Sequence, residues 1–183
     1  THVLVAAADL LKKQGLKLNF VLVGDGPERR STENLVYDLG ITSEFMFTGM
    51  IDPTGVAATL ARADVAVAPY TDLLAAEPGR GEMATPIKVL EYMAAGLPTI
   101  VSTPGNLSGI IQDEVTGWTY EPNNPEALAS VLTKVLDQQS NVTRVATAGK
   151  EKIIREYSWD RHVDRLCELF ESLTNASEDR LTN

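Results

Sequence analysis

Short apolar segments alternate with helical patterns along the whole chain, and this alternation restricts the possible folds more than any other feature. Strand-like runs lie at residues 19–23, 44–48, 65–68 and 98–102, with a shorter one at 117–120; helical patterns cover 28–39, 54–63, 87–95, 125–136, 142–157 and 160–174. Strands and helices that alternate at this spacing indicate β-α-β units. The expected fold is therefore α/β, with a Rossmann-like, doubly wound and mostly parallel sheet.

The N-terminal segment up to Gly15 allows two interpretations. The run Val3–Val5 would suit a strand, whereas the apolar residues at positions 3, 6, 7, 10 and 11 follow the spacing of one helical face. We favour the helix. A doubly wound domain that starts on a helix lacks the strand that normally comes before it, so the sheet is expected to be missing its first strand.

Length and composition suit one folded domain, which we assign to residues 1–174, followed by a polar tail at 175–183. The net charge of −9 argues against nucleic-acid binding, which depends on basic surfaces. One cysteine, Cys167, and two widely separated histidines give neither an internal disulfide nor a cluster of metal ligands. A signal peptide and a bilayer-spanning run are both missing from the sequence. We expect a cytoplasmic domain without metal or cofactor.

Ligands of doubly wound sheets bind beyond the carboxyl ends of the strands. That rule brings three segments to one rim: the turn Gly24–Pro27, the turn Gly49–Ile51 and the long irregular loop 70–85. Loops of this length inside a compact domain are usually functional or disordered. Glycine lets the backbone approach a ligand closely, but the third glycine of a dinucleotide fingerprint is missing after Gly24 and Gly26. These residues alone favour a plain tight turn.

The clearest helix follows that loop. Thr85 suits the N-cap, Pro86 the first helical position, and Gly96 the C-terminal stop. Free N–H groups and the helix dipole at such a start favour an anion. Lys88 in the first turn opposes that dipole, which is understandable if a phosphate binds there; a solvated lysine is the ordinary alternative.

Glu91 lies three residues after Lys88 on the same face of the helix. Its carboxylate could accept hydrogen bonds from the two hydroxyls of a ribose, or it could form a surface ion pair with Lys88. Spacing alone does not decide between these roles. Arg29, Arg30 and Arg80 could add positive charge near the rim, although arginines close to loops are usually only solvated.

Taken together, these segments resemble the C-terminal domain of retaining glycosyltransferases with the GT-B fold, known as group 1 or family 4. The matching stretches are Phe20-Val-Leu-Val-Gly-Asp-Gly-Pro27, Phe47-Thr-Gly49, Ala63-Asp-Val65 with Pro69-Tyr70, Pro86-Ile-Lys-Val-Leu-Glu-Tyr-Met-Ala-Ala-Gly-Leu-Pro98, Thr116-Gly117 and Tyr157-Ser-Trp159. Their order and spacing hold from residue 6 to residue 170.

The resemblance implies transfer of a sugar from a nucleoside-diphosphate sugar to an acceptor with retention of anomeric configuration, commonly without a metal. The donor diphosphate would meet the start of the helix, formed by Thr85, Pro86, Ile87 and Lys88, and Glu91 would bind the ribose hydroxyls. The turn of Gly49, Met50 and Ile51 would contact the base, with Gly24 and Gly26 beside the donor. No residue is assigned as catalytic.

The resemblance also implies parts that would precede Thr1. These are the family's first strand, with its basic turn, and the N-terminal domain that supplies the acceptor site. On this interpretation the chain is a fragment that is inactive alone and needs the N-terminal domain as a partner. Whether the parent protein docks on a membrane stays open.

Three other functions remain as alternatives. A nucleotide-sugar epimerase on the same fold would hydrolyse or rearrange the donor, which product analysis would reveal. A degenerate nucleotide-binding or protein-interaction module is suggested by Met83, which stands where the family often has a second glutamate. A flavodoxin-like domain rests on the strand and helix alternation alone, and would need an acidic cluster at the first strand ends that the sequence does not show.

Overall fold

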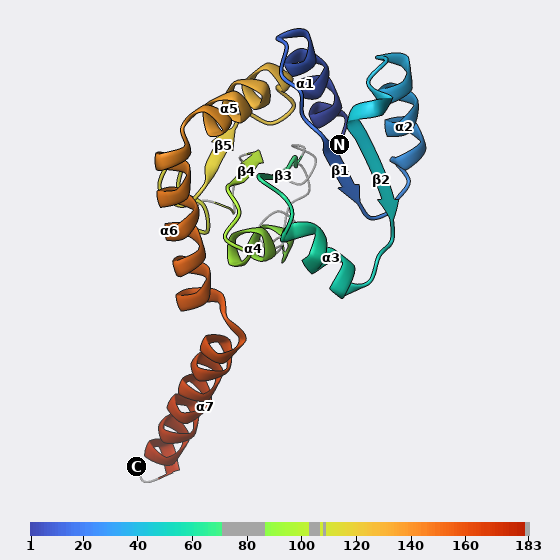
Figure 1. Cartoon of the computed structure of the whole chain (residues 1–183). Helices are drawn as coiled ribbons and strands as arrows, with labels where there is room; N and C mark the ends of the chain where they lie inside the picture. The colour runs from blue at the N-terminus through green and yellow to red at the C-terminus, as the bar shows by residue number, and fades with distance from the viewer. Residues whose placement is uncertain (71–86, 103–106, 108, 182–183) are drawn as a thin grey trace.

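The computed structural model describes residues 1–70, 87–102, 107 and 109–181. Its elements, shown in Figure 1, are α1 (His2–Lys13), β1 (Phe20–Val23), α2 (Arg29–Asp38), a 3-10 helix (Thr42–Glu44), β2 (Phe45–Gly49), α3 (Pro53–Leu60), β3 (Ala66–Ala68), α4 (Ile87–Ala94), β4 (Thr99–Ser102), β5 (Trp118–Tyr120), α5 (Pro125–Asp137), α6 (Gln139–Tyr157) and α7 (Trp159–Leu181). The predicted α/β fold is confirmed, as is the helix at the N-terminus. Residues 71–84, which include Arg80 and Met83, lie outside the described residues, and so do Thr85 and Pro86.

The strands of the described residues form two parallel sheets, β1–β2 and β3–β4–β5. Phe20 pairs with Phe45 in the first sheet, and Ile100 pairs with Val67 and Trp118 in the second. β1 and β3 are not hydrogen bonded to each other, yet side chains of both pack against one apolar cluster. The β-layer is therefore parted between β1 and β3.

Helices cover both faces of the β3–β4–β5 sheet. Ile100 of β4 faces a cluster that includes side chains of α1 and α5, whereas the next residue, Val101, faces a cluster built with Val89 of α4 and Ile153 of α6. Successive side chains of a strand point to opposite faces, so these two clusters lie on opposite sides of β4. Both residues are fully buried, which makes β4 the centre of the doubly wound layer.

The β1–β2 sheet is covered on one face. Val5 of α1 and Val36 of α2 belong to a cluster against which Phe20 and Phe45 pack, and these two rings stack with centroids 4.9 Å apart. On the strands themselves Val21, Val23 and Met46 are exposed. Since the side chains of a strand alternate between faces, the exposed residues of β1 mark the face that α1 and α2 leave uncovered.

Gly96 ends α4 as the sequence predicts. Its φ of +80° lies in the left-handed region, which glycine adopts without strain. The N–H groups of Gly96 and Leu97 donate to the carbonyls of Met93 and Tyr92 at 2.9 and 3.1 Å, the bond pattern of a Schellman motif. The chain then turns directly into β4, whose side chains are all buried.

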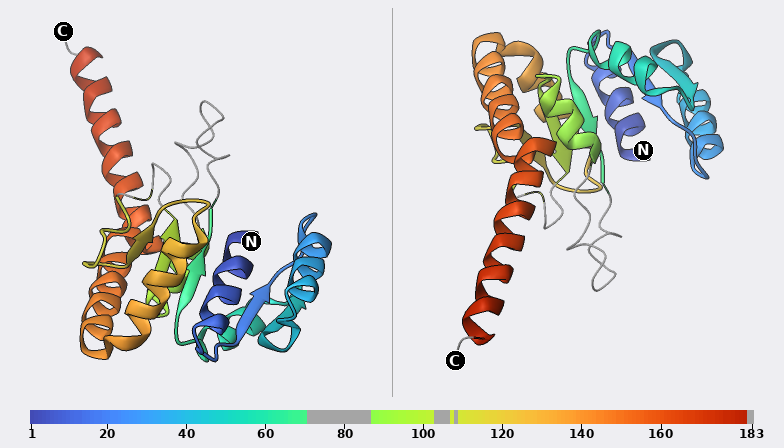
Figure 2. Two further views of the ribbon diagram at one scale, coloured as in Figure 1. Left: turned by 90° about the horizontal axis from the view of Figure 1, so that it is seen from above. Right: turned by 90° about the horizontal axis from the view of Figure 1, so that it is seen from below.

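The last helix, α7, extends away from the rest of the molecule in the views of Figures 1 and 2. It continues to Leu181, so the expectation of a helix ending at Thr174 is wrong; neither glycine nor proline interrupts residues 175–181. The boundary of the domain at 174 stays a prediction.

The exposed apolar side chains of α7 recur every three or four residues and form a stripe, here called the α7 stripe: Trp159, Val163, Leu166, Leu169, Phe170 and Leu173. None of the helices in the described residues is long and apolar enough to span a bilayer.

Candidate functional site

Two glycine turns meet at the carboxyl ends of β1 and β2. The N–H of Gly24 donates to the carbonyl of Gly49 at 2.9 Å, and the φ angles of these residues are +116° and +68°. The strand register jumps at this point, because Val23 lies opposite Gly49 while Leu22 lies opposite Phe47. The jump leaves one extra residue in β2, as in a β-bulge, directly before the glycine that bonds to Gly24. The turns at Gly24 and Gly49, which the sequence predicts beside the donor, are therefore hydrogen bonded to each other.

The turn after β1 is held by its own polar groups. Asp25 accepts a hydrogen bond from the N–H of Gly26 at 2.8 Å, and the Gly26 carbonyl accepts one from the N–H of Arg29 at 3.0 Å. A methyl group added at Gly24 or Gly26 would meet no other atom within 4 Å. The backbone of this turn is therefore ordered and open to close approach.

The turn after β2 leads straight into α3. Asp52 caps that helix by accepting a hydrogen bond from the N–H of Gly55 at 2.7 Å, and Pro53 occupies the first turn. Met50 is 79% exposed, whereas Ile51 is half-buried and its side chain lies close to Gly55. The cap fixes the direction in which the chain leaves Gly49 and presents Met50 to solvent.

The ends of β3 and β4 are tied to each other beside the start of α4. Ser102 is fully buried and donates its hydroxyl hydrogen bond to the carbonyl of Tyr70 at 2.7 Å. The ammonium of Lys88 lies 5.4 Å from the centroid of the Tyr70 ring, which is a cation–π contact. Burial raises the pKa of Tyr70 to about 12, so its hydroxyl is neutral at physiological pH. Lys88 is exposed to solvent, and its ammonium lies against this aromatic face.

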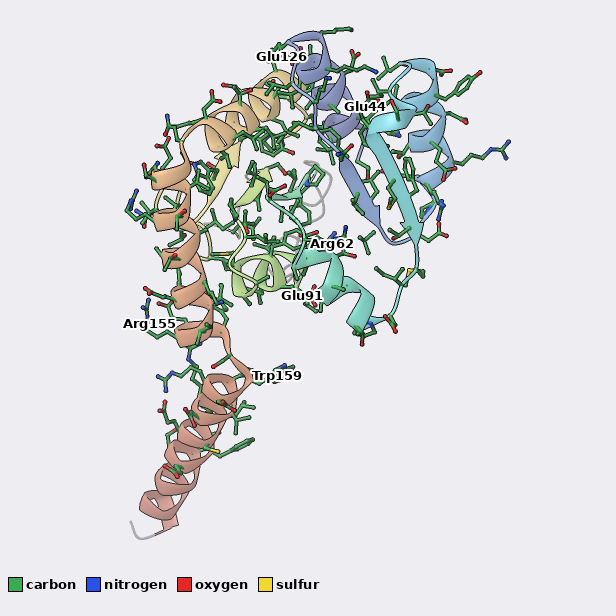
Figure 3. The ribbon with its side chains drawn as sticks, in the orientation of Figure 1. Glu44, Arg62, Glu91, Glu126, Arg155 and Trp159 are labelled. Atoms are coloured by element: carbon green, nitrogen blue, oxygen red, sulfur yellow. The ribbon has the colours of Figure 1, made fainter. Side chains whose placement is uncertain are left out.

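Glu91 is exposed and, in Figure 3, projects from α4 away from the sheet. Within the described residues Lys88 and Glu91 form no ion pair, so the surface pair considered from the sequence is not what the structure contains. Burial first, and the Glu91 charge second, raise the pKa of the neighbouring Tyr92. Ile87 at the start of the helix is 69% exposed.

The structure therefore groups the predicted residues in two places. Gly24, Gly26, Gly49, Met50 and Ile51 lie at the end of the β1–β2 sheet, and Ile87, Lys88 and Glu91 lie on α4 beside the β3–β4–β5 sheet. Among the described side chains no His, Cys, Asp and Glu residues are gathered as metal ligands would be. A shallow cavity of about 480 Å³ between α1 and α5 contains none of the predicted residues.

Sequence reasoning considered Arg29 only as a possible extra positive charge near the rim, and it gave no role to Tyr70 or Ser102. Arg29 forms ion pairs with Asp25 and Glu33, four residues before and four after it. That regular spacing was visible in the sequence and could have identified the triplet. The contacts of Tyr70 and Ser102 join residues 32 positions apart, and no local pattern indicates them.

Sequence comparison gives relatives over most of the chain. Residues 1–152 match the model of the family described as glycosyl transferases group 1. An uncharacterized glycosyltransferase from Methanocaldococcus jannaschii is 32% identical over 160 residues, which are 87% of this chain and 38% of that protein. A GDP-mannose-dependent alpha-(1-6)-phosphatidylinositol monomannoside mannosyltransferase from Mycobacterium tuberculosis is 26% identical over 165 residues, 90% of this chain and 42% of the relative.

Structure comparison shows the same fold. The Anabaena protein HepE, solved in complex with UDP and glucose, superposes with a TM-score of 0.79 at 17% identity, over 94% of this chain and 44% of that one. At this identity the likeness concerns the fold alone. The chain spans less than half the length of each of these relatives.

Proposed function

The chain belongs to the group 1 glycosyl transferases, and we propose that it is the donor-binding domain of a retaining transferase, which moves a sugar from a nucleoside-diphosphate sugar to an acceptor. The observation that carries the proposal is the joined pair of glycine turns at Gly24 and Gly49. They lie at the carboxyl edge of parallel strands, where doubly wound folds bind their ligands. The name of the mycobacterial relative specifies GDP-mannose and HepE was solved with UDP, so both diphosphates are candidate donor groups.

The proposal gives the predicted residues the following roles. The open backbone of Gly24 and Gly26 lets the donor approach, and the turn of Gly49, Met50 and Ile51 contacts the base. The backbone N–H groups of Ile87 and Lys88, at the start of α4, bind the diphosphate; Thr85 and Pro86, which belong to the same predicted site, lie outside the described residues. Glu91, which is exposed and not paired with Lys88, accepts hydrogen bonds from the ribose hydroxyls.

Lys88 contributes its charge from a fixed position. The contact with the Tyr70 ring holds the ammonium near the end of β3, on the side of the sheet where a diphosphate would lie. A lysine in the first turn of a helix is unfavourable to the helix dipole by less than about 1 kcal/mol, and a bound anion reverses that effect. Lys88 therefore neutralises donor charge rather than capping the helix.

A second domain completes the enzyme in this proposal. The relatives are more than twice as long as the matched region, and the side chains of the α7 stripe are exposed to solvent. An amphipathic helix gains most of its stability from packing its apolar face. The stripe would therefore lie against the domain that supplies the acceptor site, and the chain alone would bind donor without transferring sugar.

One more parallel strand would fit the parting between β1 and β3. Both strands pack against the same apolar cluster through Phe20, Leu22 and Val67, so the edges belong to one layer. The resemblance implies a strand before α1, and a right-handed β-α-β connection would place it beside β1.

We also place the activity in the cytoplasm, where the exposed, unpaired thiol of Cys167 stays reduced.

Calorimetric titration of the chain with UDP and with GDP tests the proposal. One of the two should bind, and Glu91→Gln should weaken it about tenfold, because a charged acceptor for two hydroxyls is lost. Glu151→Gln, an exposed glutamate on α6, is the matched control and should bind like the unaltered chain. A folded chain that binds neither diphosphate, or equal affinities for both variants, would contradict the proposal.

A further inference from the structure

Arg29 connects the two glycine turns through a single side chain. One arm of its guanidinium, Nη1, lies 3.4 Å from Asp25 Oδ2 in the turn after β1. The same nitrogen would lie only 3.0 Å from a Cβ added at Gly49, in the turn after β2. Arg29 is the first residue of α2, so the helix start, the first turn and the second turn meet at this guanidinium.

Two carboxylates fix the guanidinium in place. Nε donates to Glu33 at 2.8 Å, and this hydrogen bond is the main reason that the pKa of Arg29 is raised above its ordinary value. With Asp25 and Glu33 on either side, the positive charge is already balanced. Arg29 is therefore poorly suited to be a free cation for a diphosphate, and its ion pairs hold the guanidinium beside Gly49.

The guanidinium of Arg29 lies next to Gly49, which has no side chain. Gly49 is buried and held on one side by the hydrogen bond from Gly24, and on the other side by the guanidinium of Arg29. Its φ of +68° already excludes most residues, and any Cβ would press on Arg29. The direction in which Met50 and Ile51 leave Gly49 is thus set jointly by the backbone and by Arg29.

We infer that Arg29 is a positioning residue for donor recognition: it holds the Gly49–Ile51 turn in the orientation that contacts the base, and so contributes to the choice of base. This inference rests on the proposed function, since it assumes that the turn faces a nucleotide. A planar guanidinium can bond two carboxylates and cover a glycine together, whereas the ammonium of lysine cannot reproduce that arrangement. The effect should therefore depend on arginine and not on charge alone.

The test compares Arg29→Ala and Arg29→Lys with Arg30→Ala, the exposed neighbour on the same helix. Binding of UDP and of GDP to the chain is measured by calorimetry, with the thermal midpoint as a check on folding. We expect Arg29→Ala and Arg29→Lys to bind the preferred nucleotide roughly three- to tenfold more weakly, the size of one lost polar contact. The ratio of the two affinities should fall toward one, and Arg30→Ala should match the unaltered chain.

Equal affinities in Arg29→Ala and in the unaltered chain would overturn the inference. So would a loss of the same factor for both nucleotides, because a merely structural residue lowers both affinities and leaves their ratio unchanged. If Arg29→Ala fails to fold, Arg29→Lys keeps the charge and the aliphatic stem and carries the same comparison. An unaltered chain that binds neither nucleotide contradicts the proposed function itself, and the inference falls with it.

Discussion

The two sheets of the molecule differ in how completely they are covered. All four residues of β4 are buried, whereas the residues of β1 alternate between half-buried and exposed. Parallel sheets are normally covered on both faces, and the β3–β4–β5 sheet follows that rule. The β1–β2 sheet, which ends in the paired glycine turns, is covered by helices on one face only. Regions with fewer buried contacts open at lower free energy, so the half of the site that is proposed to contact the base should be the less stable half.

The largest difference between the halves is expected at their glycines. A Cβ at Gly149 of α6 would collide with the carbonyl oxygen of Thr116 and lie 3.2 Å from Met93 Cε. Replacing glycine by alanine in an exposed helix stabilises it by about 1 kcal/mol, but here we expect Gly149→Ala to lower the free energy of unfolding by about 3 kcal/mol. Urea denaturation measures this. Gly26→Ala, where no other atom lies within 4 Å, should stay within about 0.5 kcal/mol of the unaltered chain. A stabilised Gly149→Ala would show that α6 does not press on this part of the core.

A matched pair of valines makes the comparison with identical chemistry. Val101 of β4 is 0% exposed and Val21 of β1 is 45% exposed. Val101→Ala should cost about 2 kcal/mol in urea denaturation, since two buried methyl groups and their packing are lost, while Val21→Ala should cost less than about 0.5 kcal/mol. Similar losses for the two variants would mean that the bare face of β1–β2 is covered in solution.

The order of the elements could be predicted because apolar periodicity and glycine stops are local. The stop at Gly96 follows from such signals, and so does the N-terminal helix, whose apolar positions repeat at helical spacing. The grouping of Gly24 with Gly49 also followed from the rule that ligands bind at the carboxyl edge. Predicting these features requires only the spacing of apolar residues, local stop signals and the direction of the strands.

The remaining features depend on tertiary contacts. Which side chain covers Gly49 is decided by the register jump in β2, and no sequence period encodes that jump. The contact between Lys88 and Tyr70 joins two ends of the long loop, and Ser102 reaches Tyr70 across neighbouring strands. The length of α7 was missed because polar composition was taken to mean loss of helix, although residues 175–181 contain no helix breaker.

The smallest expected effect concerns the link between α1 and the start of β2. Lys12 lies 2.9 Å from Glu44, and hydrogen bonds from Lys12 and then Ser43 lower the pKa of Glu44 below its ordinary value of 4.5. A lowered carboxyl pKa stabilises the fold above the unfolded value, and this contribution is lost as the pH falls through the folded value. Lys12→Met should therefore show a weaker loss of stability below pH 4.5 in acid titrations followed by circular dichroism.

Lys13→Met is the control for that titration, because its ion pair with Asp9 stays within α1. It should keep the acid dependence of the unaltered chain. The effect is small because both Lys12 and Glu44 are in contact with solvent. If Lys12→Met shows the same acid profile as the unaltered chain, the ion pair between Lys12 and Glu44 does not stabilise the fold.

Hydrogen–deuterium exchange with and without the bound nucleoside diphosphate tests the central claim most directly, since it reports on both halves of the site at once. We predict slower exchange in the peptides that contain Gly24–Gly26, Gly49–Ile51 and the start of α4, with the larger change in the less stable β1–β2 half. Protection confined to the cavity between α1 and α5, or no protection at either glycine turn, would contradict the assignment of the donor site.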